Sequence, residues 1–85
     1  MILYIVRGHV NYEGEQMLGI YETLTLAKNR VYNYDPEEYG YFDKYDIIKV
    51  ETNKAYNQYH NHEIVINDEV ARKMMGYEII REDEL

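Results

Sequence analysis

The chain has 85 residues, the size of one domain, and its 46% hydrophobic content is sufficient for a small core. It contains no cysteine, which excludes a disulfide-stabilised secreted domain and a thiolate zinc module. Sixteen acidic residues against nine basic ones give a net charge of −7, which argues against direct binding to nucleic acid or to an anionic membrane. The charge favours either a basic protein partner or simple solubility.

The N-terminal apolar run, residues 1–6, is too short for the hydrophobic region of a signal peptide, and it lacks the basic n-region that precedes one. No apolar run approaches the length of a membrane-spanning helix. We therefore expect a cytoplasmic protein. The composition includes eleven tyrosines, whose large rings and polar tips suit half-buried sites and interfaces, although tyrosine is also a good strand former.

The first half of the chain predicts two strands and a helix. Residues 2–7 form a short β-branched and aromatic run, and residues 16–21 form a second, so we expect an antiparallel hairpin with a polar loop over 10–14. Thr23 is a suitable N-cap for a helix over 24–34, whose apolar residues fall on one face. The helix is expected to stop at the Asp-Pro pair that follows, because the residue before proline avoids helical geometry.

The second half predicts three more strands and a short helix. Asn67 and Asp68 offer an N-cap for that helix, and Gly76 is a suitable residue to end it. The predicted elements are a loop over 36–43, a strand over 46–51, a hairpin loop over 52–61, a strand over 63–66, a helix over 69–75 and a strand over 77–81. The order ββαββαβ predicts a single α+β domain over 1–85, with a small antiparallel or mixed sheet and helices on one face.

The segment 18–28, LGIYETLTLAK, resembles a stretch common in small uncharacterised phage and bacterial proteins of ββα type. In this pattern Gly19 permits a close approach, Thr23 caps the helix, and Ala27 packs the helix closely on the hairpin. The resemblance covers roughly residues 1–35. It implies a phage or mobile-element source, where small acidic proteins are often inhibitors of host defence systems.

Catalytic motifs are missing from the sequence. The chain has neither cysteine nor serine, and its five glycines form no phosphate-binding loop, so we expect a non-enzymatic protein without a cofactor. The pair His60 and His62, with His9 as a possible third ligand, suggests a metal half-site. The alternative is that the two histidines are solvent-exposed in a polar loop, and we expect no metal.

The stretch 32–45 is the most informative feature, because its rings alternate with carboxylates. Carboxylates pair with cations and rings accept guanidinium groups, so the stretch suits a surface rich in arginine or lysine, or a groove built for nucleic acid. Alternatively, Tyr34 and Phe42 close the core and the acids form a solvated rim. The predicted partner-binding residues are Asp35, Glu37, Glu38, Tyr39, Tyr41 and Asp43.

A second polar aromatic cluster includes Tyr56, Tyr59 and His62, which suits stacking on a nucleobase, although the cluster has little positive charge for a phosphate. The alternative is an ordinary polar hairpin.

Three functions therefore stay open. The first is a phage-encoded inhibitor, of anti-CRISPR or similar anti-defence type, that blocks a basic nucleic-acid-handling host protein. The second is an oligomeric sponge for a nucleotide signal. The third is an accessory protein that forms a homodimer through its tyrosines.

Overall fold

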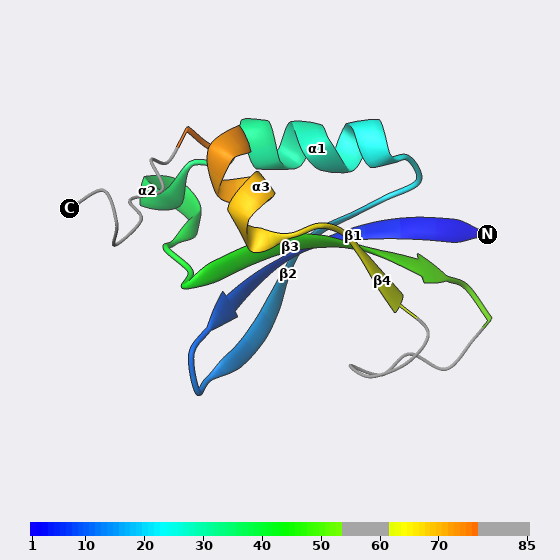
Figure 1. The fold of residues 1–85 in the computed structure, drawn as a ribbon, viewed down its shortest axis with the longest axis horizontal. Coiled ribbons are helices and arrows are strands. Elements are labelled where there is room, and N and C mark those ends of the chain that lie inside the picture. The colour runs from blue at the N-terminus through cyan, green and yellow to red at the C-terminus, as the bar shows by residue number, and fades with distance from the viewer. Residues whose placement is uncertain (54–61, 77–85) are drawn as a thin grey trace.

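The computed structural model describes residues 1–53 and 62–76, in which an antiparallel sheet of four strands is accompanied by three helices (Figure 1). The elements are β1 (Ile2–Val10), β2 (Gly14–Tyr21), α1 (Leu24–Tyr32), α2 (Pro36–Tyr39), β3 (Lys44–Glu51), β4 (His62–Ile66) and α3 (Asp68–Met74). The α+β class is therefore confirmed. The observed order is ββααββα, and the strand expected over 77–81 lies outside the described residues.

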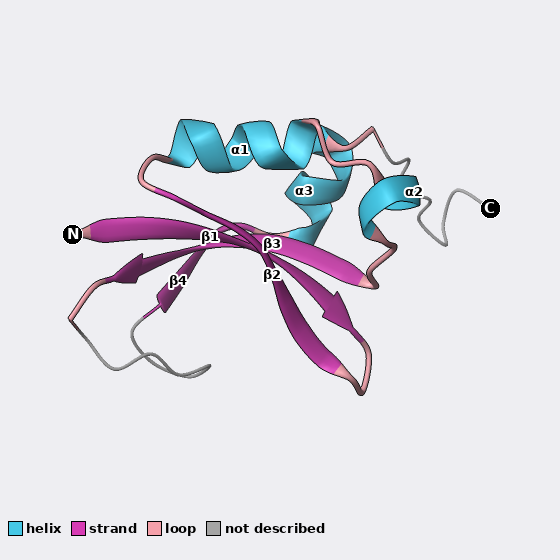
Figure 2. Ribbon diagram, turned by 180° about the vertical axis from the view of Figure 1, so that it is seen from behind, coloured by secondary structure: helices cyan, strands magenta, loops and turns pink. Residues whose placement is uncertain are grey.

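The strands lie in the order β2-β1-β3-β4, so the first strand of the chain is central. β1 pairs with β2 through the predicted hairpin, and a turn closed by the Glu13 N–H and the Val10 carbonyl joins them. β3 pairs with the other side of β1, from Ile2 opposite Glu51 to His9 opposite Lys44. Both α1 and α3 lie on one face of this sheet (Figure 2). In the described part of the chain, no helix is long and apolar enough to cross a bilayer.

The segment 36–43 differs from the predicted loop, because it begins with the one-turn helix α2. Asp35 caps this helix by accepting a hydrogen bond from the Glu37 N–H at 3.0 Å, and Pro36 occupies its first turn. The Asp-Pro pair was interpreted only as a stop for α1. It is also a start signal, because proline at the first helical position needs no N–H and aspartate is a preferred N-cap.

Other boundaries move by a few residues. β1 and β3 are longer than predicted, β2 begins at Gly14, and α1 ends at Tyr32 with Asn33 as its C-cap. The two predicted caps are confirmed: Thr23 Oγ1 accepts from the Leu26 N–H, and Asn67 Oδ1 accepts from the Val70 N–H. Of the expected 52–61 loop, only the turn at residues 52–53 is described.

The core lies between the sheet and helices α1 and α3. Its buried members are Val6, Ala27, Val31, Tyr34, Tyr45, Ile47, Ile66 and Ala71. Strand alternation directs Val6 and Gly8 of β1 toward this core and Arg7 and His9 toward the opposite face. At Gly8 the Phe42 ring packs directly on the backbone, since an added Cβ would lie 2.5 Å from the ring Cγ. The sheet thus presents a helix-covered face and a second face, which we call the open face.

Candidate functional site

The predicted binding stretch forms an exposed surface around α2. Its exposed members, which we call the acidic tyrosine surface, are Asp35, Glu37, Glu38, Tyr39 and Tyr41. No lysine or arginine occurs over 35–43, so the local charge is negative. Asp43 is also exposed, but its carboxylate accepts a hydrogen bond from the Asn11 N–H at 2.7 Å and ties the β1–β2 turn to the start of β3. Asp43 therefore has a structural role, because its carboxylate holds the β1–β2 turn in place.

Three other rings of the stretch, those of Tyr34, Phe42 and Tyr45, serve the core, as the alternative interpretation expected for Tyr34 and Phe42, whereas Tyr32 on α1 is exposed. Tyr34 is buried, and its hydroxyl donates to the Gly40 carbonyl at the end of α2. Tyr34 and Phe42 both make edge-on contacts with the buried Tyr45 ring, with centroids 5.5 and 5.8 Å apart. The tyrosines around α2 therefore have two roles. The buried rings of Tyr34 and Tyr45 fix the position of α2, while Tyr39 and Tyr41 remain exposed.

Arg30 of α1 connects the core to the acidic tyrosine surface. Its guanidinium lies 4.4 Å from the ring centroid of Tyr39 and 5.3 Å from that of Tyr34, which places it in cation–π contact with both. Its Nε also donates to the Leu18 carbonyl at 3.1 Å. Tyr39 therefore already receives one guanidinium from within the chain while half of its surface stays in solvent.

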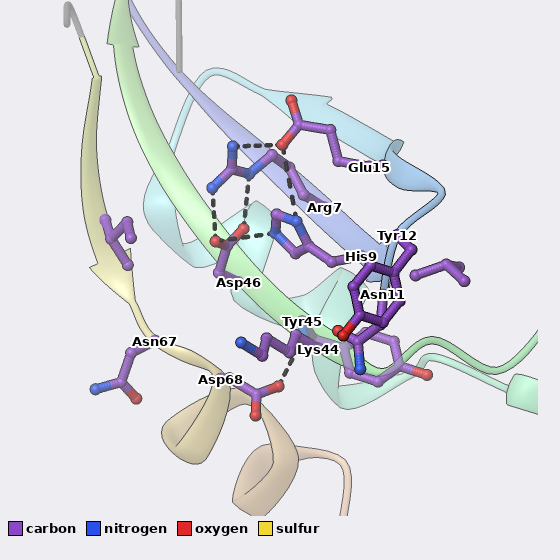
Figure 3. A pocket seen from close by; sticks show the side chains of 13 residues that line it. Arg7, His9, Asn11, Tyr12, Glu15, Lys44, Tyr45, Asp46, Asn67 and Asp68 are labelled. Carbon is purple, nitrogen blue, oxygen red and sulfur yellow. Dashed lines mark hydrogen bonds and ion pairs between the residues drawn. The ribbon is translucent and has the colours of Figure 1, made fainter. Parts of the chain in front are cut away.

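The sequence did not reveal a buried charge network on the open face, which Figure 3 shows in close-up. Arg7 of β1 and Asp46 of β3 are only 6% and 7% exposed, and they form a two-point ion pair, with Nε–Oδ1 at 2.8 Å and Nη2–Oδ2 at 2.6 Å. Glu15 of β2 binds Arg7 Nη1 at 2.7 Å. His9 Nε2 lies 3.2 Å from Asp46 Oδ2, and its Nδ1 faces Glu15 at 3.8 Å. One network thus joins three adjacent strands.

A signal for this network was present in the sequence. Arg7 ends an apolar run that was predicted to be a buried strand, and a buried charge requires a partner. The partner was not identifiable, because Asp46 is 39 residues away and becomes a neighbour only through the β1–β3 register.

An open pocket of about 590 Å³ adjoins the network, between the β1–β2 turn, the start of β3 and the β4–α3 connection (Figure 3). Tyr12 lines it from the turn, fully exposed and with a left-handed φ of 68°. Lys44 also lines it and has no ion-pair partner in the described part of the chain. The facing carboxylates are engaged within the protein: Asp46 by Arg7, and Asp68 by Arg72 and the Tyr45 N–H.

The second predicted cluster is only partly visible. Tyr56 and Tyr59 lie outside the described residues, as does His60. His62 lies on β4 opposite Val50, which in turn is opposite Leu3 of β1. His62 and His9 are therefore six residues apart along the sheet, or about 20 Å, which is too far for a shared metal. Among residues 1–53 and 62–76, no three His, Asp or Glu side chains are arranged to hold a metal ion.

The fold and these two surfaces define a small α+β domain with a single helix-covered sheet. Residues 1–61 match the model of a family described as a domain of unknown function (DUF7336), and the chain belongs to this family. The matched region includes β1 through β3, whereas β4 and α3 follow it. No curated protein and no solved structure matches the chain.

Proposed function

We propose that this chain is a non-enzymatic binding protein whose acidic tyrosine surface docks onto a basic surface of another protein. The observation that supports this proposal is the exposure of three carboxylates and two tyrosine rings within residues 35–41, a segment that contains no lysine or arginine. Such a surface matches arginine and lysine side chains, because carboxylates form charge-assisted hydrogen bonds with them and rings stack on guanidinium groups.

A simpler explanation accounts for part of this pattern. Asp35 caps α2, and Glu37 and Glu38 lie in its first turn, where acids are favoured by the helix dipole. That explanation covers the carboxylates but not the rings, since neither Tyr39 nor Tyr41 needs to be exposed for α2 to form. The contact between Arg30 and Tyr39 adds support, because the Tyr39 ring already accepts one guanidinium group, at 4.4 Å from its centroid.

In its specific form, the proposal is a phage-encoded inhibitor that acts in the cytoplasm on a basic, nucleic-acid-handling defence protein. The net charge of −7 and the resemblance of the segment 18–28 to small phage proteins support this form. In a groove built for nucleic acid, the carboxylates would take the place of phosphates and the rings that of bases.

The test is a pull-down from nuclease-treated host lysate, followed by binding measurements on the captured protein at low and high salt. We expect a basic partner whose affinity falls with salt and falls at least about tenfold in the double variant Glu37→Lys, Glu38→Lys. A double variant with the same charge change, Glu22→Lys, Glu63→Lys, alters exposed acids away from α2 and is expected to bind more tightly than the first. Equal losses of affinity in the two double variants would mean that only the net charge of the chain matters, and this result would refute docking at α2.

A second candidate function, binding of a small anionic ligand such as a nucleotide, is favoured by the pocket beside Tyr12. Its volume of about 590 Å³ lies within the range of roughly 300–1,000 Å³ typical of ligand sites. Lys44 offers a cation and Tyr12 an exposed ring. Native mass spectrometry with candidate nucleotides tests this function. A ligand that the wild type retains and Lys44→Ala loses supports binding in the pocket. A ligand that is lost only in a Tyr56→Ala, Tyr59→Ala variant supports the cluster predicted from sequence.

A further inference from the structure

The open face carries a continuous row of isoleucines, one from each strand. Ile5 of β1 is opposite Ile20 of β2 on one side and Ile48 of β3 on the other, and Ile48 is opposite Ile64 of β4. Because directly opposed residues point to the same side of a sheet, the four side chains form a band across its whole width. We call this band the isoleucine row.

Helices α1 and α3 do not cover the isoleucine row, because both pack on the opposite face of the sheet (Figures 1 and 2). The centre of the row is protected: Ile48 is fully buried and Ile5 half-buried. Toward β2 it remains open, with Ile20 51% and the adjacent Met17 55% exposed. A hollow of about 400 Å³ lies beside them, lined by Ile5, Met17, Arg7 and Glu15.

Charge distinguishes the open face from the rest of the molecule. Over β1, β2 and β3, this face carries Arg7 and Lys44 against Glu15 and Asp46, so its charges balance, whereas the whole chain carries −7. Two copies of this acidic chain can therefore approach one another through this face without a net charge repulsion. The buried ion pair of Arg7 and Asp46 already satisfies its own charges, so covering it adds little desolvation cost.

We propose that the β1–β2 half of the open face is the contact between two copies of this chain, with Met17 of each copy placed in or near the hollow of the other. The contact is independent of the acidic tyrosine surface, which lies around α2, so both can be used at once.

The size of the face sets the expected strength. Strands lie about 4.8 Å apart, and β1, β2 and β3 are about 27 Å long while β4 is about 17 Å, so the projected area is roughly 470 Å² for the sheet and about 260 Å² for the β1–β2 half. A stable interface buries about 800 Å² per partner, so this contact belongs to the small, transient class. The dimer is therefore expected to form in a concentration-dependent equilibrium.

The test is analytical ultracentrifugation of the whole chain over about a hundredfold range of concentration, at low and high salt. We expect the mass to rise from the monomer value of 10.3 kDa toward twice that value, and high salt to leave the association intact or strengthen it. Met17→Lys and Ile20→Lys are expected to weaken it at least about tenfold, because each places a charge in an apolar contact.

The matched control is Leu26→Lys, which changes a side chain of similar exposure, 50%, on helix α1 away from the open face. Circular dichroism checks that all three variants fold. A monomer at every concentration overturns the proposal and directs attention to a different partner for the row. Equal weakening by Leu26→Lys overturns it as well, because the contact would then not be specific to the open face. Docking at α2 is tested separately, because it weakens with salt.

Discussion

Replacing Asp46 with alanine is expected to destabilise the protein by about 3 kcal/mol. Breaking a buried ion pair by removing one partner costs about 3–5 kcal/mol, because it leaves a charge that water cannot reach. Arg7 and Asp46 meet this condition, with side chains 8% and 9% exposed. The lower end applies because Glu15, whose side chain is 39% exposed, keeps its own ion pair with Arg7 at 2.7 Å.

The loss is large for a domain of this size, whose total stability is expected to be on the order of 4–13 kcal/mol. Urea unfolding followed by circular dichroism measures it, and a thermal scan should show a fall in Tm of about 12–24 °C, at about 4–8 °C per kcal/mol. A double variant, Arg7→Met with Asp46→Leu, provides the decisive comparison. Removing both buried charges is expected to restore most of the loss, because the charge left without its partner, Glu15, has a side chain that is 39% exposed and can be hydrated.

The control is Lys73→Gln, which removes an exposed ion pair with Glu69 at 3.6 Å. Exposed pairs contribute roughly 0–1 kcal/mol, so this variant should unfold almost as the wild type does. A loss below about 1 kcal/mol for Asp46→Ala, equal to that of Lys73→Gln, would refute the reasoning, because the network would then behave as a solvated one.

Three further variants test local geometry by the same urea unfolding. Tyr12→Gly should stabilise the fold by roughly 0.5 kcal/mol. The relief of left-handed backbone strain, about 1–2 kcal/mol, exceeds the entropic cost of glycine, about 0.5–1 kcal/mol. Any loss of stability in this variant contradicts the account. Gly8→Ala should cost about 1–3 kcal/mol because its Cβ meets the Phe42 ring, and the same change should cost less in a Phe42→Ala background, where the ring Cγ and Cδ atoms are absent. Thr23→Ala should cost about 1 kcal/mol through loss of the α1 cap, whereas Thr23→Asp should retain stability.

Local chemistry made much of the fold predictable. The caps at Thr23 and Asn67 were identified because a short polar side chain directly precedes a periodic apolar segment. The hairpin followed from two β-rich runs around a glycine turn. Asp35 and Pro36 were interpreted only as the end of α1, although the same two residues also begin α2. Each of these features depends on residues within a few positions of one another.

Long-range features were not accessible in the same way. The Arg7–Asp46 pair and the isoleucine row depend on the β1–β3 register, and a shift of that register by one residue would move every side chain of β3 to the other face. The division of tyrosines into buried Tyr34 and Tyr45 and exposed Tyr39 and Tyr41 likewise depends on where α2 packs. Identical residue types in one short stretch gave no local basis for that division.

The central position of β1 has a consequence for how the chain folds during synthesis. β1 ends at Val10 and its partner β3 begins at Lys44, so 33 residues lie between them, which a ribosome adds in about 2–7 s. During that interval β2 can protect one side of β1, while the other side has no native strand to pair with. The nascent hairpin therefore presents a transient β-edge that includes Ile5 and Val6, and chaperone binding or early self-association is expected to concentrate there.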